Sequence, residues 1–237
     1  MALELKQIAH IETPFKTKFG VPRQAGLMEA PCRVVFEPDF RVAEAVRGLE
    51  EFDYVWLLWG FHLNGQKVEK SKGLRAEESW SPTVRPPRLG GNKRVGVFAT
   101  RSPYRPNPVG LSSVKLLKVS MEVGLGPVLT VSGADLVDGT PIYDIKPYIT
   151  YADSHAEARS GFASEAPQAA LEVKDPEGCL LKMPEDEADV LRQSLAQDPR
   201  PHYQDDPERV YAMLFGDHEV RFRVEGGVAV VVSVKKC

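Results

Sequence analysis

With 237 residues, the chain is long enough for one large or two small domains. Its hydrophobic content of 43% and charged content of 27% are ordinary for a soluble globular protein and exclude a low-complexity chain. The net charge of −3 is uneven, because residues 1–150 hold 20 Lys and Arg against 16 Asp and Glu, whereas residues 151–237 hold 10 against 17.

The sequence gives no sign of a membrane span, an oxidising compartment or a metal site. The longest apolar run, Tyr54–Phe61, is too short to cross a bilayer, and the N-terminus lacks the apolar segment of a secretory signal. The three cysteines are scattered, so we expect ordinary thiols in a reducing cytoplasm. No two of the five histidines have helical ligand spacing, and we expect no metal.

The first 61 residues are predicted to form short strands and one short helix. The segment Phe15–Leu27 is expected to be a long loop, because glycine and proline recur in it, and this leaves Arg23 and Gln24 free to serve a site. The expected elements are strands at Leu5–Ile11 and Cys32–Phe36, a helix at Phe40–Arg47 capped by Asp39, and a central strand at Tyr54–Phe61.

A basic, irregular segment, Asn64–Arg94, follows the central strand. Its part from Lys67 to Arg94 has eight basic residues against three acidic ones. Such an excess is typical of a surface that contacts a phosphate backbone, but a solvated surface loop explains the charge equally well.

The segment Arg101–Pro108 is the most unusual in the chain. It follows an expected strand, Arg94–Thr100, and contains three prolines, two arginines, Tyr104 and Asn107. Three prolines in six residues exclude a helix or central strand, so we predict a stiff loop that is preorganised to bind a ligand. A proline-rich turn with solvated arginines is the alternative.

Strands are expected again at Val109–Val119 and Val128–Val131, around a turn at Gly124–Pro127. The next segment, Gly133–Tyr148, is expected to be a second functional loop. It places Asp135, Asp138 and Asp144 within ten residues, and Asx turns with one salt bridge would account for only one or two of these acids.

The composition changes at residues 152–170, which are rich in Ala, Ser and Glu, and we expect a domain boundary there. The predicted domains are residues 1–152, an antiparallel β-barrel, and residues 153–237, a small α+β unit. The fold class is therefore mainly β. The second unit is expected to contain a helix from Pro184 to Gln197 and a three-stranded antiparallel sheet from Arg209–Phe215, His218–Val224 and Val228–Val234.

Several motifs together resemble the TsaA-like family. They are Val21–Gln24, Thr83–Gly91, Gly96–Asn107, Asp135–Pro141, Asp144–Tyr148 and Ala196–Pro201. The best-understood members are bacterial tRNA methyltransferases that use S-adenosylmethionine to methylate the N6 of threonylcarbamoyl-adenosine at position 37. The resemblance implies a barrel that binds this cofactor without a Rossmann motif, and a homodimer with its sites near the interface.

The resemblance also implies the cofactor contacts by matching position. These are Arg23, Gln24, His62, Arg101, Leu111, Asp135, Leu136, Val137 and Asp138. One departure is that Leu63–Ser81 is longer and more basic than expected, with Leu63 where a polar residue would stand beside His62.

For the reaction itself, we expect a carboxylate to accept the proton of the methylated nitrogen. Asp138 is the first candidate and Asp144 the second, while Tyr104, Arg105 and Asn107 would orient the substrate base. Lys67–Arg94, with Arg221 and Arg223, would contact tRNA. Two alternatives stay open: a non-catalytic module that binds RNA or the cofactor, and a methyltransferase whose acceptor is a small molecule or protein.

Overall fold

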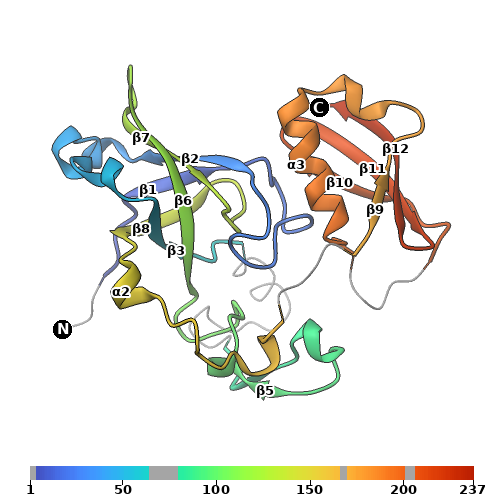
Figure 1. Ribbon diagram of the computed structural model, residues 1–237, viewed down its shortest axis with the longest axis horizontal. Coiled ribbons are helices and arrows are strands. Elements are labelled where there is room, and N and C mark those ends of the chain that lie inside the picture. The colour runs from blue at the N-terminus through green and yellow to red at the C-terminus, as the bar shows by residue number, and fades with distance from the viewer. Residues whose placement is uncertain (1–3, 64–79, 166–169, 201–205) are drawn as a thin grey trace, which may run out of the picture.

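The computed structural model describes residues 4–63, 80–165, 170–200 and 206–237, which form mainly β structure (Figure 1). Within them, six antiparallel strands close into a barrel in the order β1-β2-β7-β6-β3-β8, which confirms the predicted class. No helix in these ranges is long and apolar enough to cross a membrane. The barrel strands are β1 (Ala9–Glu12), β2 (Pro31–Phe36), β3 (Tyr54–Gly60), β6 (Val109–Glu122), β7 (Gly126–Ser132) and β8 (Thr140–Pro147).

Strand β3 is central, as predicted, because it pairs with β6 on one side and β8 on the other. Val55, Leu57 and Trp59 alternate along it and are buried inside the barrel. On the outer face, Trp56 packs on the ring of Tyr148, with 5.7 Å between ring centroids. This outer cover explains why the strand is apolar on both faces.

The first strand is shorter than the predicted Leu5–Ile11. Strand β1 begins at Ala9, which lies opposite Phe36 at the end of β2. Ile8 still has two backbone hydrogen bonds, from its N–H to the carbonyl of Ile142 at 2.8 Å and from the N–H of Glu37 to its carbonyl at 2.9 Å, but β2 ends at Phe36 and so gives no register partner before Ala9.

The predicted helix at Phe40–Arg47 is wrong, because two short 3-10 helices occupy this region, Pro38–Phe40 and Ala43–Val46. Val46 is the only buried residue in the two, so no apolar face supports a longer helix. Between them, the guanidinium of Arg41 donates to two backbone carbonyls, of Phe36 at 3.0 Å and of Gly124 at 2.9 Å.

The strand predicted at Arg94–Thr100 is largely wrong. Strand β5 covers only Val95–Gly96, pairs with the two-residue β4 (Thr83–Val84), and is followed by a 3-10 helix at Val97–Ala99. β4 offers no partner beyond two residues, and the side chain of Phe98 is left 74% exposed.

The segment predicted as a loop at Gly133–Tyr148 is a loop only in its first part. Gly139 has a φ of +72°, as expected for the Asp138-Gly139 turn, but strand β8 follows immediately. The prolines that argue against a strand, Pro141 and Pro147, stand at its second and last positions.

The C-terminal sheet contains the three predicted strands, β10 (Tyr211–Phe215), β11 (His218–Glu225) and β12 (Val228–Lys236), and helix α3 (Glu185–Ala196). The prediction of a three-stranded antiparallel sheet is nevertheless incomplete. In the described chain a fourth strand, β9 (Glu172–Lys174), pairs in parallel with β12. Strand β9 has three residues and only its middle one is partly buried, so it is too short to show the alternation of apolar and polar residues that marks a strand.

A segment between β1 and β2, Thr13–Gln24, reaches from the barrel to the C-terminal sheet, and we call it the crossing segment. Phe15 forms an isolated antiparallel bridge with Phe215, and the two rings meet edge to face at a centroid distance of 5.8 Å. The backbone N–H of Gly216 donates to the carbonyl of Pro14 at 2.8 Å. Both phenylalanines are fully buried, so the barrel and the sheet share one core at this point.

Further along the crossing segment, Phe19 stacks on Tyr211 and Phe222, with ring centroids 6.4 and 6.2 Å apart. The hydroxyl of Ser194 on α3 donates to the carbonyl of Gly20 at 2.9 Å. The course of the crossing segment is therefore set by the C-terminal sheet and helix as well as by the barrel.

Replacing Phe215 by alanine tests this shared core. Phe215→Ala should lower the free energy of unfolding by about 3–5 kcal/mol, because a fully buried aromatic side chain is lost from the core. Urea denaturation measures the change. Leu214→Ala is the matched control, since the adjacent side chain is 39% exposed and should lose less than about 1 kcal/mol. Equal losses in both variants would contradict the shared core.

Candidate active site

A cavity of about 250 Å³ lies where β3 ends, between the barrel and the crossing segment. Three stretches of chain supply most of its walls. They are Lys18, Val21 and Pro22 of the crossing segment, residues 59–63 at the end of β3, and residues 135–137 before β8, joined by Pro103 and Thr140.

A chain of hydrogen bonds fixes the polar floor of this cavity. The indole N–H of Trp59 donates to the hydroxyl of Ser112 at 2.9 Å, and that hydroxyl donates to Oδ1 of Asp135 at 2.5 Å. An added Cβ at Gly110, opposite Trp59 on β6, would collide with the indole ring, so glycine makes room for it. The carboxylate of Asp135 is thereby held in one orientation.

Burial raises the pKa of the Asp135 carboxyl above its ordinary value, because a charged group loses hydration in the cavity wall. The hydroxyl of Ser112 and the positive charge of Arg101 act in the opposite direction and favour the carboxylate. A raised pKa in a cavity lining is the pattern that functional carboxyl groups show.

His62 stands at the mouth of the cavity, and burial lowers the pKa of its imidazole. The ammonium of Lys18 acts in the same direction. Both effects favour the uncharged imidazole. Lys18 donates to the carbonyl of Leu63 at 3.2 Å, so its positive charge is held against the same wall.

The unusual loop Arg101–Pro108 meets the crossing segment beside the cavity. Arg101 donates to Oε1 of Gln24 at 2.6 Å, and the amide of Gln24 donates to the carbonyl of Arg23 at 2.6 Å. The guanidinium of Arg23 in turn contacts the carbonyl of Asp198 at 3.3 Å. The predicted cofactor residues Arg23, Gln24 and Arg101 thus form one connected set.

Asp198, at the end of this set, has the left-handed φ of +48°, which is rare outside glycine. Its carboxylate binds Arg200 in two places, at 2.8 and 3.0 Å. Although burial acts to raise it, the pKa of Asp198 is lowered, because the Arg200 guanidinium stabilises the charged form.

Comparisons with known proteins agree with this architecture over nearly the whole chain. Residues 10–154 match the tRNA-methyltransferase O N-terminal domain and residues 165–237 match the TrmO C-terminal domain. The chain belongs to the TrmO family.

Relatives in this family are similar in sequence and structure. The Escherichia coli protein named tRNA (adenine(37)-N6)-methyltransferase is 42% identical over 232 residues, which is 94% of each chain. A Methanothermobacter thermautotrophicus protein named "Probable S-adenosyl-L-methionine-binding protein" is 36% identical over 154 residues, 65% of this chain and 96% of that protein. The crystal structure of TrmO from Pseudomonas aeruginosa has a TM-score of 0.74, 33% identity and 99% coverage of both chains.

Within this TrmO chain, four of the predicted site residues line the cavity directly, namely His62, Asp135, Leu136 and Val137. Lys18, Trp59 and Phe61 line it too, and sequence reasoning missed them. Trp59 and Phe61 are indistinguishable from core residues in an apolar run. Lys18 carries no local signal, because its place depends on how the crossing segment packs.

The structure places Asp138, the first expected proton acceptor, outside the cavity lining. One carboxylate oxygen accepts the backbone N–H of Thr13 at 2.8 Å, and the other pairs with Lys16 at 2.8 Å. These contacts attach the turn before β8 to the start of the crossing segment.

Asp144 and Leu111 lie on the outer face of the barrel. Both are opposite Leu58 in the strand register, and Leu111 is 54% exposed. The Asp144 carboxylate pairs with Lys146 at 2.8 Å. Alternation along a strand turns these side chains away from the interior that Ser112 and Trp59 occupy.

The residues expected to orient the substrate base lie on the loop at the cavity rim. Tyr104 and Asn107 are exposed, and the guanidinium of Arg105 donates to the carbonyl of Thr100 at 2.9 Å. Of this loop only Pro103 lines the cavity. Residues 64–79, which include half of the predicted basic surface, lie outside the described residues.

The raised pKa of Asp135 leads to a pH-dependent prediction. A carboxyl group with a raised pKa in the folded state stabilises the fold below its unfolded pKa, and this stabilisation is lost as the pH rises through the folded pKa. Asp135→Asn, which cannot ionise, should therefore gain stability relative to the wild type as the pH rises from 4 to 8. Urea denaturation at each pH measures the difference.

The control for this experiment is Asp144→Asn, the same change at a position whose side chain is 42% exposed. Its free energy of unfolding at pH 7 should stay within about 0.5 kcal/mol of the wild type. A stability difference between Asp135→Asn and the wild type that is constant across the pH range would contradict the assignment.

Proposed function

We propose that this protein is an S-adenosylmethionine-dependent methyltransferase that acts on N6 of adenine 37 in tRNA. The observation that carries the proposal is the cavity at the end of β3, with its buried carboxylate, uncharged imidazole and lysine, in a chain whose two halves both match TrmO domains. The names of relatives that cover nearly its whole length support the same reaction.

The groups that line the cavity fit the cofactor chemically. Lys18 would pair with the cofactor carboxylate, and Asp135 would face its positive charge. Trp59 and Phe61, whose ring centroids are 4.4 Å apart, supply an aromatic wall for adenine. The uncharged His62 adds no positive charge that would repel a sulfonium.

When bound, S-adenosylmethionine supplies a methyl group that is already activated toward displacement, so positioning accounts for most of the rate. Ser112 and Trp59 fix the carboxylate of Asp135, and the Arg101–Gln24 contact fixes the adjacent wall. Of the lining groups, His62 and Asp135 are able to take up the proton that the methylated nitrogen loses. We assign this step to one of these two residues in place of Asp138 and Asp144.

The finer part of the proposal is that the acceptor is threonylcarbamoyl-adenosine. A modified nucleotide that leaves the anticodon loop needs an aromatic surface and a partner for its carboxylate. The aromatic surface would come from two exposed side chains, Tyr104, beside Pro103 at the cavity rim, and Phe98. Arg101 would pair with the carboxylate of the nucleotide, since its guanidinium is exposed and adjacent to Asp135.

The surface that would contact the tRNA backbone extends from this rim. Arg85, Arg88, Lys93 and Arg94 are exposed on the β4–β5 segment next to Phe98. We propose that they bind phosphates, and that the predicted Arg221 and Arg223, exposed on β11, add a second contact.

We also propose the predicted domain division, 1–152 and 153–237, a cytoplasmic location beside the tRNA pool, and a homodimer. The β6–β7 hairpin projects beyond the rest of the barrel (Figure 1). The dimer is supported by apolar side chains that are exposed along β6 and in the turn after it: Leu111, Leu117, Met121 and Val123.

The reaction is tested with methyl-labelled S-adenosylmethionine and one tRNA species, either unmodified or carrying threonylcarbamoyl-adenosine. We expect label only in the modified tRNA, in one nucleoside identified by mass spectrometry. Asp135→Asn should reduce the rate roughly tenfold or more, because a charged contact to the cofactor is lost. Label in the unmodified tRNA would contradict the acceptor, and no label in either would favour a binding module.

The phosphate surface is tested by charge reversal. Arg85→Glu with Lys93→Glu should weaken tRNA binding and reduce the slope of log affinity against log salt by roughly 1 per lost contact. The control reverses two distant exposed cations, Arg47→Glu with Lys174→Glu, and leaves the salt slope unchanged. Equal effects of both pairs on the salt slope would contradict the assignment.

A further inference from the structure

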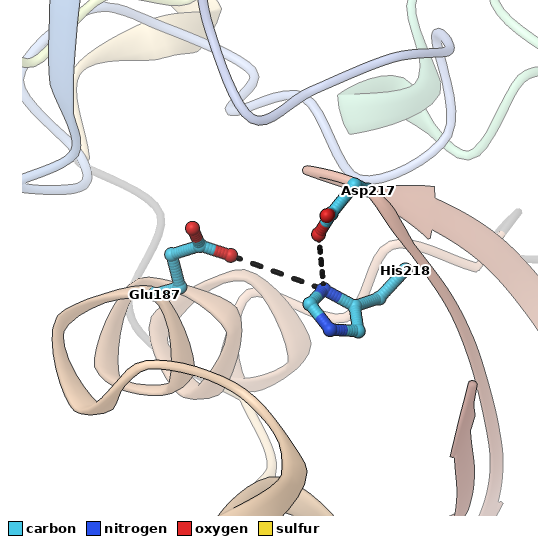
Figure 2. Close-up of side chains that lie close together, drawn as sticks. All are labelled: Glu187, Asp217 and His218. Atoms are coloured by element: carbon cyan, nitrogen blue, oxygen red, sulfur yellow. Dashed lines mark ion pairs between the residues drawn. The ribbon is translucent and has the colours of Figure 1, made fainter. Parts of the chain in front are cut away.

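A second polar cluster lies on the C-terminal sheet, in residues to which the methyl transfer reaction assigns no part. It consists of Glu187 on the first turn of α3, and Asp217 and His218 at the turn between β10 and β11 (Figure 2). One potential metal-ligand atom from each residue lies within 4.8 Å of the others.

The imidazole of His218 is buried, with 5% of its surface exposed, and both carboxylates point toward its Nδ1 (Figure 2). Among the described residues, neither Nδ1 of His218 nor Oε2 of Glu187 has a hydrogen-bond partner, although both atoms are buried. Nδ1 lies 2.8 Å from Oδ1 of Asp217, but the pair lacks hydrogen-bond geometry. Buried polar atoms without partners are rare in folded proteins, and a bound ion is one way to satisfy them.

The spacing of these atoms suits one cation. Two atoms that each bind an ion at about 2.1 Å can be no more than about 4.2 Å apart. Nδ1 of His218 is 2.8 Å from Oδ1 of Asp217 and 4.0 Å from Oε2 of Glu187, so each of these two pairs lies within that limit.

Neighbouring groups hold the three side chains in place. Nζ of Lys236 lies 3.1 Å from Oδ2 of Asp217, so it pairs with one oxygen and leaves Oδ1 directed at His218. Gly216 leaves room for Glu187, because an added Cβ would come within 3.1 Å of Oε2. A cavity of about 300 Å³ between α3 and the barrel, lined by Glu187 and Gly216, gives an ion access.

We propose that Glu187, Asp217 and His218 bind a divalent transition-metal ion, with one nitrogen and two oxygen ligands of the kind that Zn²⁺ accepts. The bound ion connects the start of α3 to the β10–β11 turn. The same turn contacts the crossing segment through Gly216 and Pro14, so the ion reinforces the contact between sheet and barrel. The site does not depend on the methyl transfer reaction.

From the sequence we expected no metal, so this proposal departs from that expectation. Helical ligand spacing is a pattern within one element, whereas Glu187 and the Asp217-His218 pair come from separate elements of the fold.

The test uses the full chain, without an affinity tag and stripped of metal. Calorimetric titration with Zn²⁺ should give one site, and the melting temperature should rise with added Zn²⁺. Glu187→Gln should weaken Zn²⁺ binding about tenfold or more and remove the rise in melting temperature. Glu185→Gln, the same change at an exposed position on the same helix turn, is the control and should bind as the wild type does.

His218→Gln should also lose binding, but Glu187→Gln is decisive because its partly exposed side chain can change without unfolding the protein. Far-ultraviolet circular dichroism checks that the fold persists. Absence of Zn²⁺ binding by the wild type, or equal binding by the wild type and Glu187→Gln, would overturn the proposal. Equal binding would place the ion on thiols or other histidines.

Discussion

The burial of Phe15 and Phe19 against the C-terminal sheet is the contact on which the rest of the architecture depends. Both phenylalanines belong to the crossing segment, whose residues Lys18, Val21 and Pro22 form a wall of the candidate active site. A loop of this length in water would cost considerable conformational entropy to hold in one shape. Edge-to-face and stacked aromatic contacts offset that cost. The C-terminal unit therefore stabilises the shape of a cavity that none of its described residues lines.

The cavity combines two groups whose environments shift their pKa values in opposite directions. Burial raises the pKa of the Asp135 carboxyl against the opposing hydrogen bond from Ser112, while burial lowers the pKa of the His62 imidazole. The lowered pKa of His62 disfavours an imidazolium charge there, and the ammonium of Lys18 is held against the same wall. Such a distribution suits a ligand with both a positive and a negative group, because each finds a partner at a different wall.

Sequence reasoning succeeded where the signal is local. The apolar run of β3, the Gly226-Gly227 hairpin and the acidic start of α3 each express their structure within a few residues, and all three form. It could not give side-chain directions that depend on distant parts of the chain. Asp138 and Asp144 stood in the right motifs, but the direction of each side chain is set by Thr13 and Lys16 for one and by the register with Leu58 for the other. Lys18 and the Glu187–His218 cluster had no local signal, because packing between separate elements creates them.

The bridge between Phe15 and Phe215 joins residues about 200 positions apart, and β1 also pairs with β8 across most of the barrel sequence. Contacts so distant along the chain form slowly, and during synthesis they cannot form until the later partner has left the ribosome. The barrel can close once β8 has emerged, but the crossing segment acquires its aromatic partners only with the last strands. The order of synthesis therefore delays completion of the cavity wall until nearly the whole polypeptide is available.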